Sequence, residues 1–181
     1  MQMVTFRLAD SLPREAYERI MAHDGPQKRR RLEEMMDSGR GACVLRNPAI
    51  ARVVVSSLNH FDGRRYRLIR WVVMPNHAHV PIEQIEGYPL GGLVQGWKSF
   101  TAKEINNVRR TSGSVWAADY FDRFIRSRQH FGDAMSYIDY NPVAAGLVNT
   151  HDEWPFSSAA RNAGGTLAAP GNEASVLSGL I

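Results

Sequence analysis

The sequence predicts an α+β fold of the ferredoxin-like kind, in which helices pack against an antiparallel sheet. Segments with strand character alternate with segments of helical periodicity, in the order strand, helices, strand, strand, helix, strand, helix. A continuous apolar run, Trp71 to Met74, is typical of a strand that is covered on both faces. At 181 residues with 44% hydrophobic content, the chain is long enough for one core and short for two.

The first half of the chain supplies one strand and two helical regions. Residues 4–8 alternate as a strand does, and helical periodicity follows from about 13 to 36, with a break expected near 24–26. Asn47-Pro48 predicts the start of a helix over 49–59, because asparagine caps helix N-termini and proline fits the first turn.

A hairpin of two strands is expected next, over residues 64–74 and 77–84, joined through Pro75-Asn76. Pro81 lies in the second strand and cannot donate a hydrogen bond to a neighbour. We therefore expect that strand to bulge or stop near Pro81.

The remaining pattern predicts a helix over 90–108, a strand over 120–126 and a helix from His130 to about Tyr140. Pro142 disfavours helical geometry in the residue before it, so the last helix is expected to end or bend there.

We expect residues 1–158 to form a single domain and residues 159–181, rich in Ala, Gly and Ser, to form a flexible tail. The single cysteine, Cys43, excludes an internal disulfide and fits a reducing compartment. No run of about 18 apolar residues occurs, and no signal-peptide pattern is seen, so we expect a soluble cytoplasmic protein.

The charge is distributed unevenly along the chain. Residues 1–128 carry 21 of the 22 Lys and Arg against 13 acids, whereas residues 129–181 carry one basic residue against five acids. Arginine, which suits bidentate phosphate contacts, far outnumbers lysine. Nucleic acid is the natural polyanionic partner for such a chain, and a solvated basic face is the simpler alternative.

His77 and His79 form the first candidate site. If residues 77–83 are extended, the two imidazoles project from the same face, roughly 6 to 7 Å apart, and can share a metal ion. Glu83 lies on the same face and is a backup ligand, although a solvated carboxylate at the strand end is its simpler interpretation.

Tyr137 and Asn141 form the second candidate site, because residues four apart share one face of a helix. Packing that face on the histidine side of the sheet would bring two imidazoles, an amide oxygen and a phenol together. A divalent ion held this way keeps open positions for a phosphate oxygen. Mg²⁺ or Mn²⁺ suits phosphate chemistry best, and Zn²⁺ is the alternative.

A phenol can attack a phosphodiester and form a phosphotyrosine that a nucleic-acid hydroxyl later reverses without ATP. Such chemistry suits cutting and rejoining of strands. The ordinary phenol pKa of about 10 means that the tyrosine needs a nearby cation or base. Tyr140 is the rival nucleophile, although core or surface packing is its simpler role.

Several stretches together resemble one known family. Met74-Pro-Asn-His-Ala-His-Val80 is similar to the His-hydrophobic-His motif of HUH nucleases, and three further segments follow in the family's order: 97–103, 120–126 and 137–148. As a set they resemble the REP-associated tyrosine transposases, over about residues 4–158.

The resemblance implies a single-tyrosine HUH transposase fold and a divalent ion, Mg²⁺ or Mn²⁺, bound by His77 and His79. It also implies that Tyr137 is the nucleophile and that Asn141 is the third ligand. Family members cleave single-stranded DNA beside a hairpin through a 5′-phosphotyrosine, so palindromic DNA repeats are the implied partner and the nucleoid the implied location. The candidate DNA contacts are Arg64, Arg65, Arg67, Arg70, Lys98, Lys103, Arg123 and Arg126.

Other functions stay open on the sequence alone. A domesticated protein could retain hairpin binding with weak or no cleavage, an idea that Ala78 and Pro81 favour. An RNA-binding ferredoxin-like domain is disfavoured, because no strand carries the paired aromatics that stack bases. A metal hydrolase is disfavoured by the lack of a clear carboxylate base.

Overall fold

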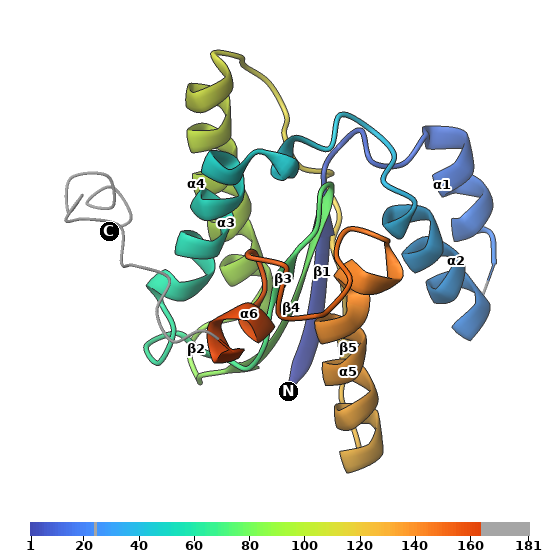
Figure 1. Cartoon of the computed structure of the whole chain (residues 1–181), viewed down its shortest axis with the longest axis vertical. Coiled ribbons are helices and arrows are strands. Elements are labelled where there is room, and N and C mark those ends of the chain that lie inside the picture. The colour runs from blue at the N-terminus through green and yellow to red at the C-terminus, as the bar shows by residue number, and fades with distance from the viewer. Residues whose placement is uncertain (24, 164–181) are drawn as a thin grey trace.

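Antiparallel strands form the centre of the structure, and helices lie on both faces of the sheet (Figure 1). The structure is a computed structural model that describes residues 1–23 and 25–163. Across the sheet the order is β2, β4, β1, β5, and β3 also pairs with β4. The strands are β1 (Gln2–Arg7), β2 (Tyr66–Leu68), β3 (Val72–Val73), β4 (His77–Gln84) and β5 (Phe121–Phe124). The predicted α+β class with an antiparallel sheet is confirmed.

The helices follow the sequence pattern closely. They are α1 (Arg14–Met21), α2 (Pro26–Asp37), the 3-10 turn η1 (Val44–Arg46), α3 (Pro48–His60), α4 (Leu90–Arg109), α5 (Arg128–Ala144) and α6 (Ser158–Ala163). The predicted break between α1 and α2 is confirmed. The cap at Asn47 is confirmed as well, since its side chain accepts a hydrogen bond from the backbone N–H of Ala49.

Alternation along β4 gives the two faces of the sheet different roles. Ala78, Val80 and Ile82 point into the main core, where α3 and α4 cover the sheet. His77 and His79 point to the opposite face, which α2 and α5 approach (Figure 1). The same strand thus builds the core with one set of residues and the candidate site with the other.

The prediction for Pro81 was wrong, because β4 runs without a bulge from His77 to Gln84. The interruption falls in the neighbouring strand instead. The strand predicted over 64–74 is divided into β2 and β3, because the residues between Leu68 and Val72 leave the regular pairing with β4. Within a strand the N–H and C=O of one residue point the same way, and the carbonyl of Pro81 accepts from Ile69 in this gap. The donor that proline lacks would therefore have faced the gap.

Of the two outcomes predicted at Pro142, an end or a bend, the end was wrong, because α5 continues through this proline to Ala144. Proline is tolerated here because it lies in the last turn, where only one backbone bond is lost, that to the carbonyl of Ile138. The consequence matters for the site, since Tyr137 and Asn141 remain on one regular helix.

After α5 the chain returns to the sheet, where Trp154 donates from its indole N–H to the carbonyl of Val73 at 2.9 Å. Residues 158–163 form α6, and the rest of the expected tail, residues 164–181, lies outside the described residues. Among the helices that the structure describes, none has the length and apolar character needed to cross a membrane.

Candidate active site

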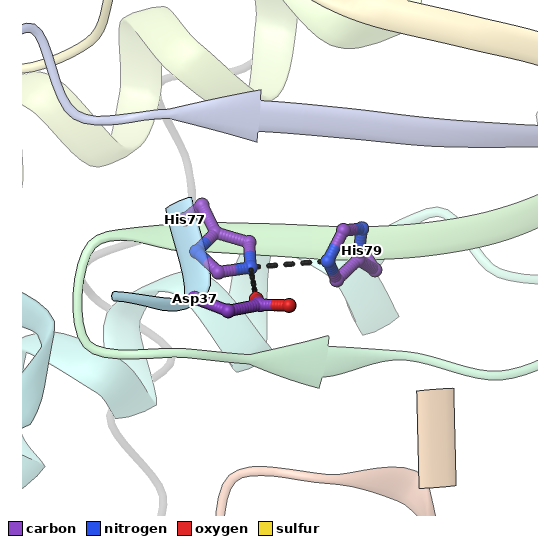
Figure 2. Close-up of side chains that lie close together, drawn as sticks. All are labelled: Asp37, His77 and His79. Carbon is purple, nitrogen blue, oxygen red and sulfur yellow. Dashed lines mark hydrogen bonds and ion pairs between the residues drawn. The ribbon is translucent and has the colours of Figure 1, made fainter. Parts of the chain in front are cut away.

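Two buried imidazoles from β4 face each other. His77 and His79 are both 0% exposed, and their Nε2 atoms lie 3.0 Å apart, as Figure 2 shows. The sheet fixes this arrangement, because Arg7 and Thr5 of β1 pair in register with His77 and His79. The side-by-side placement follows directly from the two-residue spacing in an extended strand.

Asn76 determines which nitrogen of His77 carries the proton. The Asn76 amide nitrogen lies 3.0 Å from the carbonyls of both Met36 and Arg40, so it is the donor side of the amide. The Asn76 Oδ1 atom therefore accepts from His77 Nδ1 at 2.7 Å. In the neutral imidazole this leaves the lone pair on Nε2, directed at His79.

His79 is held in the same way by a residue of the neighbouring strand β1. Its Nδ1 lies 2.8 Å from the hydroxyl oxygen of Thr5, which can accept a hydrogen bond from Nδ1–H. The ring proton then stays on Nδ1, and Nε2 carries a lone pair. Burial, together with the charges of His77 and Arg123, holds the pKa of His79 well below its usual range. Two lone pairs at 3.0 Å repel each other unless a cation or proton lies between them.

Asp37 completes the cluster, and the sequence reasoning missed it. This last residue of α2 places its Oδ1 atom 3.3 Å from His77 Nε2 (Figure 2). One weak signal was available. The helix dipole disfavours a carboxylate in the last turn of a helix, and the last turn of α2 has no basic residue to offset it. An acid at this position therefore indicates a role other than stabilising the helix.

The helix α5 brings Tyr137 and Asn141 to the same point. The Tyr137 hydroxyl lies 3.3 Å from His79 Nε2 and 3.5 Å from Asp37 Oδ2. The Asn141 amide nitrogen lies 3.3 and 3.4 Å from the two oxygens of Asp37. Asn141 is 2% exposed, and its Oδ1 atom has no hydrogen-bond partner among the described residues.

The surroundings of Tyr137 keep its phenol protonated. Burial, then the charges of Asp37 and Glu33, raise the pKa of Tyr137, and the opposing charge of Arg123 does not offset them. A neutral phenol is a weak nucleophile, so a reaction of Tyr137 would need a positive charge or a base beside it.

The donor set fits a divalent cation. Asp37, His77 and His79 offer ligand atoms that all lie within 4.8 Å of one another. Mixed nitrogen and oxygen donors with an orphaned amide oxygen beside them are ligands that Mn²⁺, Mg²⁺ and Zn²⁺ use. A cation would also remove the repulsion between the two Nε2 lone pairs.

The two backup candidates lie away from the cluster. Glu83 is exposed and pairs with Arg67 at 3.6 Å near the far end of β4. Tyr140 is 55% exposed, and its ring lies 5.1 Å from that of His151. Both fit their simpler interpretations.

The expected DNA contacts fall into three groups. Arg123 of β5 lies on the site face of the sheet, since it pairs with Met3 in register, and Arg126 is exposed just after β5. Arg70 pairs with Asp139 of α5 at 3.8 Å. A second group surrounds β2, with the guanidinium groups of Arg64 and Arg65 over the ring of Phe61. Arg67 belongs to this group, and Lys103 is exposed on α4.

Lys98 departs from the expectation. It is 8% exposed, and its ammonium donates to the carbonyls of Ala118 and Asp119 at 3.0 and 3.2 Å. The sequence suggested a surface position because Lys98 lies away from the apolar stripe that Leu93, Trp97, Phe100 and Ile105 form on this helix. The loop after α4 folds back over this side chain, and loop paths of this kind are not readable from periodicity.

Comparison with known proteins gives relatives of one kind. No family model matches the chain. The REP-associated tyrosine transposase of Escherichia coli (strain K12) is 26% identical over 95 residues, which is 52% of this chain and 55% of that protein. A Haemophilus influenzae protein, named provisionally as another such transposase, is 30% identical over 53 residues, 29% of this chain and 30% of its own length. The chain thus spans about half or less of the curated relatives it matches.

A solved structure shares the fold. The structure of a REP-associated tyrosine transposase bound to a REP hairpin superposes with a TM-score of 0.57 at 18% identity, covering 93% of this chain and 81% of that one. Together these comparisons confirm the resemblance to the REP-associated tyrosine transposases that the sequence motifs indicate.

Proposed function

We propose that this protein is a metal-dependent transposase that cuts and rejoins single-stranded DNA beside a hairpin, with Tyr137 as the nucleophile. One observation carries the proposal: the partly buried phenol of Tyr137 lies 3.3 Å from one of two facing imidazoles, in contact with a carboxylate. Strand transfer fits these features better than plain hydrolysis does: a tyrosine beside potential metal ligands, in a basic chain of this fold.

In this proposal His77, His79 and Asp37 hold Mg²⁺ or Mn²⁺, and the carbonyl oxygen of Asn141 is a further ligand. When bound, the ion would supply positive charge that offsets Asp37 and stabilises negative charge on the oxygens of the scissile phosphate. Asn76 and Thr5 fix the two imidazoles so that both Nε2 lone pairs face the ion.

The chemical step balances with the groups present. The Tyr137 oxygen attacks the phosphorus and forms a phosphotyrosine bond to the 5′ side of the break, while the bond from phosphorus to the 3′ oxygen breaks. The phenol proton passes to Asp37 Oδ2, which lies 3.5 Å away and is the oxygen turned from His77. The departing 3′ oxygen takes up a proton and becomes a hydroxyl. Rejoining is the reverse, with a DNA 3′-hydroxyl as attacking group.

The partner in this proposal is a DNA hairpin with an unpaired flank, by analogy with the structurally similar transposase, which is bound to a REP hairpin. Arg70, Arg123 and Arg126 contact the backbone near the cluster. Arg64, Arg65, Arg67 and Lys103 extend the contact over the rest of the hairpin. Residues 1–158 make up the catalytic domain.

The test is a covalent-adduct assay. Purified protein is mixed with single-stranded hairpins from the repeats beside its own gene and with Mn²⁺ or Mg²⁺, and an adduct that survives SDS is sought. We expect an adduct with the wild type, none with Tyr137→Phe, and none when a chelator is present. Tyr140→Phe is the matched control and should react like the wild type.

The alternatives give different results in the same assay. Loss of the adduct in Tyr140→Phe alone would contradict the assignment of the nucleophile. Hairpin binding without any adduct would favour a domesticated binding protein. A released, unlinked product that persists in Tyr137→Phe would point to metal-dependent hydrolysis.

A further inference from the structure

A second feature of the site face is a pocket between α2 and the sheet. Its floor is made by Met3 and Thr5 of β1 with Phe121 and Arg123 of β5, and Glu33 and Met36 of α2 line the opposite side. None of these six residues belongs to the ligand set or contributes the nucleophile. The pocket is therefore a separate element of the site face.

The pocket adjoins the metal cluster directly. Thr5 contacts His79 Nδ1 at 2.8 Å, and Met36 precedes Asp37 in the chain. Phe121 pairs in register with Thr5, and Thr5 pairs with His79, so Phe121 lies two strand spacings, about 10 Å, from His79. This is the span of one nucleotide from its phosphate to the far edge of its base.

The lining suits an unpaired nucleobase. Phe121, Met3 and Met36 offer an aromatic ring and two polarisable thioethers, against which the flat face of a base can stack. Arg123 is a donor and Glu33 is an acceptor, which are the two functions needed to read the edge of a base. Arg123 pairs in register with Met3, two residues before Thr5 on β1, so its side chain lies on the same face of the sheet as His79.

We propose that this pocket holds the base of an unpaired nucleotide next to the cleaved phosphate, and that Glu33 selects bases with an exocyclic amino group. The inference rests on the proposed function, because that function puts the phosphate at the cluster. Adenine, cytosine and guanine carry an amino group that can donate to a carboxylate, whereas the single donor of thymine, its ring N3–H, lies between two carbonyl oxygens that a carboxylate repels.

The test uses a hairpin from the repeats beside the gene, extended on each side by four randomised unpaired nucleotides. Protein-bound and free DNA are separated without added catalytic metal, and both pools are sequenced. We expect thymine to be depleted about ten-fold at one flanking position in the wild-type bound pool, the size of effect that a good base-edge contact gives. Glu33→Gln should abolish that depletion, because an amide can also donate to thymine.

Glu34→Gln is the matched control. It makes the same change one residue along α2, where Glu34 is exposed and pairs with Arg30 at 2.7 Å. It should keep the wild-type preference. Phe121→Leu retains an apolar side chain and removes the ring, so we expect roughly ten-fold weaker binding of flanked hairpins with little change for hairpins that lack a flank.

The outcomes separate the two proposals. If the adduct forms but no flanking position shows a preference, or Glu34→Gln alters the preference as much as Glu33→Gln, the pocket assignment is overturned and the proposed function stands. If the preference responds to Glu33→Gln but no adduct ever forms, the pocket stands and the cleavage proposal fails. Absence of hairpin binding would overturn both.

Discussion

At the scale of single residues, Asn76 connects two halves of the candidate site. It is 1% exposed, accepts from His77 Nδ1, and donates to two carbonyls at the end of α2, on either side of Asp37. One amide thus orients an imidazole from the sheet and anchors the helix end that carries the carboxylate. Residues that hold metal ligands in this way contribute strongly to affinity without touching the ion.

We expect Asn76→Asp to weaken Mn²⁺ binding by about 10- to 100-fold, because the carboxylate cannot donate to either carbonyl and releases the end of α2. Calorimetric titration with Mn²⁺ measures the effect, and Asp37→Asn, which removes a proposed ligand, sets the scale. Asn106→Asp is the control, since Asn106 donates to the Gly113 carbonyl in an exposed turn. Equal affinity of Asn76→Asp and wild type would show that Asn76 does not position the site.

Residue spacing alone predicted four members of the cluster, because period two in a strand and period four in a helix place His77 with His79 and Tyr137 with Asn141. Asp37 could not be predicted in this way. Its position depends on how the end of α2 docks beside β4, and that docking is set by Asn76 and by the small apolar cluster around Leu32 and Met36, not by any local pattern.

At the scale of elements, a polar cluster attaches α1 to the sheet. Asp119 accepts from Tyr17 of α1 at 2.5 Å and pairs with Arg7 of β1 at 3.3 Å. The Arg7 side chain is 7% exposed, and its Nε atom is a buried donor without a partner in the described part of the chain. Removing the carboxylate would therefore leave a buried guanidinium without its counter-charge.

We expect Asp119→Asn to lower the free energy of unfolding by about 2 kcal/mol, less than the loss of a fully buried pair costs, because 31% of the Asp119 side chain is exposed. Urea denaturation followed by circular dichroism measures the change. Glu18→Gln in α1 is the control, since its pair with Arg14 is on the surface and should be nearly neutral. A loss equal to that of the control would mean that the cluster does not anchor α1.

Helices and strands were predictable from the sequence where hydrophobic periodicity is strong. They were not predictable where a residue of an adjacent strand determines the end of an element. The long helix α4 and the strand β4 match their predicted ranges within a residue or two. The division of β2 from β3 arises opposite Pro81, so a residue in one strand interrupts another. Considering only the strand that contains Pro81 therefore predicts a break in β4, whereas the break lies between β2 and β3.

At the scale of the whole molecule, a buried phenol in the core, Tyr66, makes the free energy of unfolding depend on pH in the alkaline range. Tyr66 is 0% exposed, donates to the Leu58 carbonyl at 2.6 Å and accepts from the Trp97 indole at 3.0 Å. Burial raises the pKa of Tyr66 from 10.0 to about 12. The folded state therefore favours the neutral phenol, a contribution that is complete below pH 10 and is lost as the pH rises towards 12.

We expect Tyr66→Phe to cost about 2 kcal/mol of unfolding free energy at neutral pH, because two buried polar groups lose their partner. The difference from wild type should narrow by roughly 2 kcal/mol as the pH rises through the Tyr66 pKa, since only the wild type can ionise there. Urea unfolding at a series of pH values measures both. A constant difference across the alkaline range would contradict the link between Tyr66 ionisation and stability.

The order of strands in the sheet also determines when the protein becomes competent during synthesis. Among the described strands, β1 is made before the others, and both of its partners are far downstream, in β4 and β5. Sheets built from such distant pairings fold slowly, because the loops between partners must close first. The histidines can meet Thr5 once β4 has emerged, but Tyr137 and Asn141 arrive only with α5. In the proposed function, a nascent chain therefore gains the ligands Asp37, His77 and His79 before Asn141 and the nucleophile Tyr137, and it cannot break a DNA strand until α5 has docked.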